Sequence, residues 1–149
     1  MCYRLAFFVT VYLREEHDIS ANAVVGYAHD QTSPVMASHA WVEVEAKKTD
    51  LSLAFTEEPD IQLPGEVLIL DHVYKPGHRY AYFRERNDAA NEVIRTLLDD
   101  PQFLLVVRHN EAEHAKMAEL SQNTAQMRQY LDAAPDGLSY DALARSIRT

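Results

Sequence analysis

The 149-residue sequence contains a single cysteine, Cys2, and no long apolar run. One cysteine cannot form a disulfide within the chain, so nothing implies an oxidising compartment and a cytoplasmic location is expected. No apolar stretch approaches the roughly 18 residues needed to span a bilayer, which argues against a membrane protein. The first residues lack the basic cluster and small-residue cleavage site of a signal peptide, so we interpret them as part of the fold.

Basic residues are also scarce: 14 Lys and Arg stand against 23 Asp and Glu, which gives a formal net charge of −9. Nonspecific nucleic-acid binding needs a basic face that neutralises phosphates, and this composition can hardly supply one. Only four glycines are present, and none forms a glycine-rich phosphate loop. Nucleic acid is therefore not an expected partner.

The length fits one domain, residues 1–149, with a core over 2–84. Apolar residues at helical spacing predict a helix over 2–16 that carries Cys2 in its first turn. Alternating and β-branched runs then predict an antiparallel sheet of about four to five strands. The expected strands cover 23–28, 39–46, 49–55, 66–70 and 79–83. Helix first, strands next and helices last is an α+β order.

Two pairings are expected within that sheet. Strands 39–46 and 49–55 would form a hairpin that turns near Lys47, and strands 66–70 and 79–83 would flank the Pro-Gly turn of YKPGH. In the first hairpin, Asp50 would lie opposite Glu45 or Ala46. A contact between Asp50 and His39 would then require a wider loop, a bulge or a different register.

Residues 85–149 are expected to be helical, and their large apolar side chains either pack on the sheet or support a homodimer. These side chains are Leu98, Leu104, Leu105, Met117, Leu120, Met127 and Leu131. Helices are expected to begin after a cap at Asn87 or Asp88, after a cap at Asp100 with Pro101 as the first helical residue, and after a cap at Ser139. A long helical run is expected over 110–134.

Three residues could form a catalytic set. A thiol becomes nucleophilic at neutral pH when its pKa falls, and Cys2 at a helix N-terminus faces unpaired backbone N–H groups and the positive end of the helix dipole. His39, at the start of a strand, could act as general base, and Asp50 could hold its other ring nitrogen. Trp41 alternates onto the same face as His39 and, with Tyr3, is a candidate for substrate contact.

Each of these residues also has a structural interpretation. A cysteine on an apolar helix face is commonly buried and inert. Asp50 could be a turn residue that binds its own backbone, and Trp41 could simply pack the sheet. The run HNEAEH (109–114) combines imidazoles and carboxylates, but His109 and His114 diverge around a helix, so a solvated face is favoured over a metal site.

The segments CYRLAFFVTVYLREEHDISANAVVGYA and SHAWVEVEAKKTD together resemble the core of the transglutaminase-like cysteine hydrolase superfamily, which has a papain-like fold. The resemblance covers about residues 2–55. It implies that Cys2 is the nucleophile, His39 the base and acid, and Asp50 the residue that orients the imidazole. It also implies a peptide or small amide substrate, with no metal and no organic cofactor.

One departure from the family pattern concerns the oxyanion hole. Family members carry residues before the cysteine, whereas only Met1 precedes Cys2 here. The oxyanion donors could be the backbone N–H groups of Cys2 and Tyr3, a side chain elsewhere, or an upstream segment missing from this sequence. Removal of Met1 would alternatively leave the α-amine of Cys2 free to act as the base.

Two functions follow as hypotheses. The first is a cysteine hydrolase or acyltransferase that acts on an amide bond through Cys2, His39 and Asp50. The alternative is a catalytically inactive binding or scaffold domain that keeps the fold. An enzyme should keep Cys2 accessible and within about 4 Å of His39, whereas a scaffold could bury or separate the two.

Overall fold

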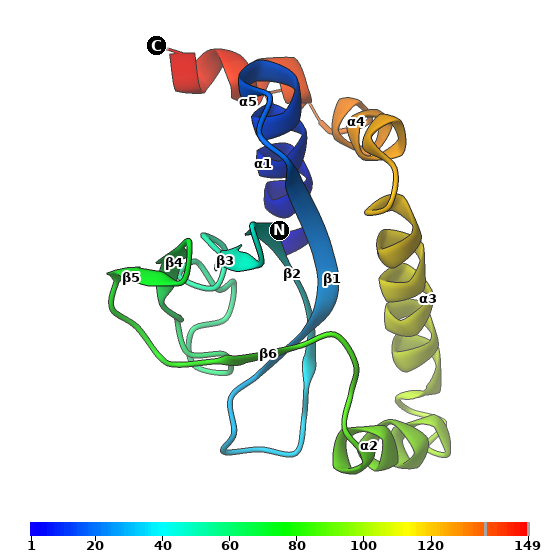
Figure 1. The fold of residues 1–149 in the computed structure, drawn as a ribbon. Coiled ribbons are helices and arrows are strands. Elements are labelled where there is room, and N and C mark those ends of the chain that lie inside the picture. Colours follow the sequence, from blue (N-terminus) through cyan, green and yellow to red (C-terminus); the bar gives the residue numbers. More distant parts are fainter. Residues whose placement is uncertain (136, 149) are drawn as a thin grey trace.

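The computed structural model describes residues 1–135 and 137–148, and its architecture is α+β, as expected. One helix precedes the strands and the remaining described helices follow them (Figure 1). The elements are α1 (Cys2–His17), β1 (Ala21–His29), β2 (Ala37–Val44), β3 (Lys47–Thr49), β4 (Val67–Ile69), β5 (His72–Lys75), β6 (Ala81–Phe83), α2 (Asp88–Leu98), α3 (Leu104–Leu120), α4 (Thr124–Asp132) and α5 (Tyr140–Arg148).

The described strands form two antiparallel sheets. The larger sheet has the order β3-β2-β1-β6, and β4 and β5 form a separate pair. In Figure 1 the small sheet lies on one side of the molecule, and α2, α3 and α4 follow the other side toward α5 at the top. The larger sheet matches the expected strand number, whereas the second sheet was not anticipated.

The hairpin between β2 and β3 turns earlier than expected. Val42 pairs with Thr49 and Val44 with Lys47, so the turn consists of Glu45 and Ala46, which have φ angles of 50° and 62°. Two residues with positive φ match the right-handed twist of a hairpin. The prediction of a turn near Lys47 was therefore wrong.

The expected strand 49–55 ends after Thr49. Its next residue, Asp50, leaves the hairpin and exchanges backbone hydrogen bonds with Leu68: Asp50 N donates to Leu68 O and Leu68 N to Asp50 O, both at 2.9 Å. This bridge attaches the small sheet to the edge of the larger one. Residues 51–64 continue as an irregular loop.

The second expected pairing was also wrong. The β4 strand pairs with β5 through a turn at Leu70 and Asp71, again with positive φ angles of 50° and 66°. The Pro-Gly segment instead leads into β6, which pairs with β1. Because the chain turns tightly at Leu70 and Asp71, residues 72–75 pair with β4. Residues 81–83 therefore pair with β1 in the larger sheet.

Helix α1 forms the centre of the core because its apolar face meets both the sheet and the C-terminal helices. Ala6 packs with Ala21, Ala40 and Val42 of the sheet. A second cluster joins the helix to β1 and to the C-terminal helices: Phe7, Phe8, Val11, Ala23, Met117, Met127, Leu131, Tyr140 and Ala144. The helix ends at His17, and the following residue, Asp18, takes a left-handed conformation and donates its N–H to Leu13 O.

The C-terminal region is helical, but the expected run over 110–134 is interrupted. The α3 helix ends at Leu120, and Asn123 caps α4 by accepting the N–H of Gln126 at 3.1 Å. An asparagine favours such a cap over a helix interior because its side chain competes for backbone donors. None of the described helices has the length and apolar character needed to cross a membrane.

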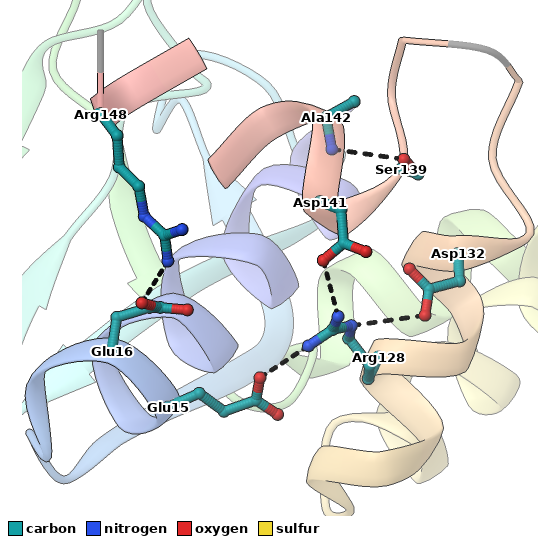
Figure 2. A network of polar contacts seen from close by, with 8 residues as sticks. All are labelled: Glu15, Glu16, Arg128, Asp132, Ser139, Asp141, Ala142 and Arg148. Atoms are coloured by element: carbon teal, nitrogen blue, oxygen red, sulfur yellow. Dashed lines mark hydrogen bonds and ion pairs between the residues drawn. The ribbon is translucent and has the colours of Figure 1, made fainter. Parts of the chain in front are cut away.

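The remaining helix starts agree in part with the sequence. Asn87 caps α2 through the N–H of Ala90, as expected, and Ser139 accepts the N–H of Ala142 at the start of α5 (Figure 2). The α3 helix starts at Leu104 and not at Pro101, because the Asp100 carboxylate accepts the N–H of Gln102 and holds a separate turn.

Arg128 ties three helices together near the chain's C-terminal end (Figure 2). Its guanidinium donates to Glu15 of α1 at 2.7 Å, to Asp141 of α5 at 2.9 Å and to Asp132 of its own helix at 3.3 Å. It also lies 3.7 Å from the centre of the Tyr140 ring. The side chain is 29% exposed, so solvent weakens each pair, but one planar cation serves all four contacts.

We expect Arg128→Ala to lower the free energy of unfolding by about 1–2 kcal/mol, because the network and the cation–π contact are lost together. Urea unfolding followed by circular dichroism measures this. Arg145→Ala is the matched control, since Arg145 is exposed on α5 and forms no ion pair among the described residues. Equal effects of the two substitutions would contradict a structural role for the network.

Candidate active site

Cys2 is the first residue of α1, and this helix start lies against β2. The thiol side chain is partly exposed. The first intrahelical bond runs from Leu5 N to Met1 O at 3.2 Å, so the N–H groups of Cys2, Tyr3 and Arg4 have no partner within the helix. Cys2 thus sits where the sequence analysis expected it, at the positive end of the helix dipole.

His39 and Asp50 form a buried pair on the sheet. His39 Nε2 lies 2.6 Å from Asp50 Oδ2, and the two residues are 4% and 2% exposed. The early turn explains their contact: continuing the observed register one residue beyond Thr49 places Asp50 opposite Trp41, diagonal to His39 on the same face. The register expected from the sequence placed Asp50 opposite Glu45 or Ala46 and so kept it away from His39, and the structure shows that this register was wrong.

Asp50 is held by several donors besides His39. Its Oδ1 accepts the Ser52 N–H at 2.9 Å and the Ser52 hydroxyl at 2.8 Å, and its Oδ2 accepts the Tyr82 hydroxyl at 2.8 Å. Burial alone would raise the pKa of Asp50, but the hydrogen bond and charge of His39 and the bonds from Ser52 and Tyr82 lower it. Asp50 is therefore a fixed carboxylate.

The Cys2 thiol and the His39 imidazole lie close enough to influence each other's ionisation. Because Nε2 of His39 faces Asp50, Nδ1 is the ring nitrogen left for the thiol. Burial would raise the pKa of Cys2, yet the hydrogen bond and charge of His39, together with the backbone N–H of Ala40, lower it overall. The arrangement favours a thiolate beside an imidazolium.

The pKa of His39 changes in the matching direction. Burial disfavours the imidazolium, but hydrogen bonds to Asp50 and Cys2 and the negative charges of both raise the pKa of His39 to about 9. Protonated His39 and deprotonated Cys2 stabilise each other, which favours the ionic form of the pair.

A cavity of about 380 Å³ opens beside these residues. Met1, Cys2, Ala37, Ser38 and His39 line it from the start of α1 and from β2, and Ser52 lines it from the loop after β3. The opposite wall belongs to the loop between β3 and β4, through Leu53, Phe55, Thr56, Glu57, Glu58, Ile61 and Gln62. Cys2 and His39 therefore line one space that can hold a small molecular group.

Trp41 lies behind the site and does not line this cavity. It is 2% exposed, packs edge-on against Tyr82 with ring centres 5.3 Å apart, and donates its indole N–H to Glu43 at 3.0 Å. A Cβ atom added to Gly26 would lie 2.8 Å from the Trp41 ring, so this glycine lets the ring approach β1 closely. The expected role as a substrate wall does not fit this placement.

Tyr3 also points away from the cavity of Cys2. Its hydroxyl is hydrogen-bonded to Ser38, which in turn bonds His114 Nδ1. Tyr3 lines a second cavity of about 450 Å³ that also includes Met36, Ile94 and Val107. Ser38 borders both cavities, so Tyr3 is one residue removed from the cavity that Cys2 lines.

The histidines of HNEAEH have separate partners. His109 pairs with Glu113 at 3.5 Å on the surface of α3. His114 instead stacks on Tyr27, with ring centres 4.6 Å apart. Across the described residues 1–135 and 137–148, no group of three or more His, Cys, Asp or Glu side chains is arranged to hold a metal ion.

Two functional neighbours of Asp50 were missed from the sequence. Ser52 follows it by two residues, the spacing at which an aspartate accepts a backbone N–H, so a turn analysis of DLS could have found it. Tyr82 lies 32 residues beyond Asp50 in the sequence and reaches it only because β6 pairs with β1. No local signal in the sequence indicates that contact.

Comparisons of the chain with protein-family models, with curated proteins and with solved structures give no match.

We expect Asp50→Asn to lower the pKa of His39 from about 9 by at least about one pH unit, because the substitution removes the carboxylate that stabilises the imidazolium. The ring Cε1–H resonance followed by NMR against pH measures this, and a His39→Ala spectrum identifies the resonance among the seven histidines. Tyr82→Phe is the control, since it removes a hydrogen bond to Asp50 and keeps the charge. An unchanged His39 pKa in Asp50→Asn would contradict the pairing.

Proposed function

We propose that the protein is a cysteine-nucleophile hydrolase or acyltransferase that acts on amide bonds. One observation carries the proposal: the single cysteine begins a helix and lines one cavity together with His39, and His39 is held by buried Asp50. The resemblance of residues 2–55 to transglutaminase-like cysteine hydrolases supports the same chemistry. Thiol–imidazole chemistry requires neither a metal nor an organic cofactor.

Acylation would begin with attack of the Cys2 thiolate on the carbonyl carbon of the substrate. A C–S bond forms and the carbonyl oxygen becomes an oxyanion. The His39 imidazolium then donates its proton to the nitrogen of the leaving group, the C–N bond breaks, and an amine departs. Asp50 remains ionised throughout and keeps the imidazole ring oriented.

Deacylation would return the enzyme to its starting state. Neutral His39 removes a proton from water, or from an acceptor amine in an acyl transfer, as this nucleophile attacks the thioester carbon. The C–S bond breaks and a carboxylic acid or a new amide leaves. Cys2 and His39 recover the thiolate–imidazolium pair.

The oxyanion needs hydrogen-bond donors near the sulfur. The N–H groups at the first turn of α1 have no acceptor within the helix, and the Cys2 N–H is attached to the nucleophilic residue itself. Gln62 lines the same cavity and offers a side-chain amide. These groups are the donors that we assign to the oxyanion hole.

The geometry favours the enzyme over the scaffold alternative. A scaffold has no need for a partly exposed thiol beside a histidine, nor for a buried carboxylate behind that histidine. His39 also supplies the base, so the chemistry does not need the α-amine of an N-terminal cysteine. A free catalytic thiol suits a reducing compartment such as the cytoplasm.

We expect the rate of iodoacetamide alkylation at Cys2 to change little between pH 6.5 and 8.5, because the thiol is already ionised beside the imidazolium. In His39→Ala the rate should be low at pH 6.5 and rise about tenfold per pH unit toward an ordinary thiol pKa. Intact mass spectrometry follows the single modification. Identical pH profiles for the two proteins would refute an activated nucleophile.

The amide chemistry itself is tested with a panel of peptidyl fluorogenic amides, with and without an added amine acceptor. Wild type should release the fluorophore, whereas Cys2→Ala should lose release completely. The product mass distinguishes hydrolysis from acyl transfer. A reactive thiol that cleaves no amide in the panel would favour the scaffold alternative.

A further inference from the structure

The wall of the cavity opposite Cys2 carries unpaired negative charge. Glu57 and Glu58 both line it, and both are exposed. Among the ion pairs of residues 1–135 and 137–148, none engages either carboxylate, and no Lys or Arg belongs to the lining. A charged group that enters the cavity therefore meets two free carboxylates on one side.

The other side of the cavity does not offset this charge. The Asp50 carboxylate and the Cys2 thiolate face two cationic groups, the His39 imidazolium and the N-terminal ammonium of Met1, which also lines the cavity, so this side adds no net positive charge. The chain as a whole carries −9. A cation is thus attracted both at a distance and within the cavity, whereas an anion is repelled.

The same loop also exposes apolar surface to the cavity. Phe55 is 62% exposed and Ile61 is 80% exposed, although both are large apolar residues. The Phe55 ring already accommodates a cation, since Lys75 Nζ lies 5.6 Å from its centre without lining the cavity. An aromatic face beside free carboxylates suits the alkyl stem and charged head of a basic side chain.

We propose that the cavity selects amide substrates that carry a positively charged side chain next to the reacting bond. The proposal rests on the proposed function and adds the substrate class to it. Glu57 and Glu58 attract the cationic head, and Phe55 and Ile61 contact its alkyl part. Basic peptides are the class of substrate with this chemistry.

Charged thiol reagents test the proposal without knowledge of the substrate. Methyl, 2-aminoethyl and 2-sulfonatoethyl methanethiosulfonates carry zero, positive and negative charge and react alike: the Cys2 sulfur forms a disulfide bond and methanesulfinate leaves. For each protein, the rate with a charged reagent is divided by the rate with the methyl reagent. This division removes the effect of any change in the intrinsic reactivity of the Cys2 thiol. The ratios on the urea-unfolded chain correct for the reagents' own reactivity.

In wild type we expect the corrected ratio of cationic to anionic rates to exceed one, and to fall at least about threefold in Glu57→Gln/Glu58→Gln at low ionic strength. Glu85→Gln/Glu119→Gln is the matched control, because it removes the same charge from exposed, unpaired carboxylates outside the cavity. This control should leave the ratio close to the wild-type value.

The outcomes separate the two proposals. In one outcome the methyl reagent labels Cys2 quickly, but Glu57→Gln/Glu58→Gln changes the ratio of cationic to anionic rates no more than the control does. This outcome overturns the substrate class and leaves the activated thiol in place. Slow methyl labelling typical of an ordinary thiol overturns the proposed function, and the substrate class with it. Fast labelling with a ratio that falls only in the cavity variant supports both.

Discussion

The hydrogen bond between His39 and Asp50 is the interaction on which the rest of the site depends. A buried carboxylate is costly unless it is paired and fully hydrogen-bonded, and Asp50 meets that requirement with donors from three places: His39 on β2, Ser52 in the following loop and Tyr82 on β6. Its backbone also bridges to Leu68. The two sheets and the loop of the cavity therefore converge on one carboxylate, and its charge in turn keeps His39 protonated.

Cys2 reaches this pair through the packing of α1 and not through sequence proximity. Ala6 on the sheet side and Phe7, Phe8 and Val11 on the other side fix the helix between β1, β2 and the C-terminal helices. Arg128 joins the far end of α1 to α4 and α5 (Figure 2). A helix held at its far end and along its length presents its first residue in a defined position, which a thiolate–imidazolium pair requires.

Much of this arrangement could be predicted from the sequence. The 3.6-residue period identified α1, the alternation of HAWVEVE identified β2, and the order of the elements identified the α+β fold. The register could not be predicted, because the turns at Glu45–Ala46 and Leu70–Asp71 adopt positive φ without the Asn or Gly that marks such turns. The two interpretations of Asp50 also proved compatible: its Oδ1 closes a local turn with Ser52 while its Oδ2 binds His39.

Negative charge from Glu57 and Glu58 has opposite effects on the two side chains of the site, His39 and Cys2. Carboxylates near the site stabilise protonated His39 but disfavour the Cys2 thiolate, so acidic residues in direct contact with the sulfur would weaken the nucleophile. In this protein the groups that lower the Cys2 pKa are His39, the charged N-terminus and the backbone N–H of Ala40, and Glu57 and Glu58 belong to the exposed loop that lines the same cavity. Because both carboxylates are exposed, solvent weakens their effect on the sulfur. Under the proposed substrate class, a bound basic substrate would bring positive charge into the cavity, which would offset these carboxylates and favour the Cys2 thiolate.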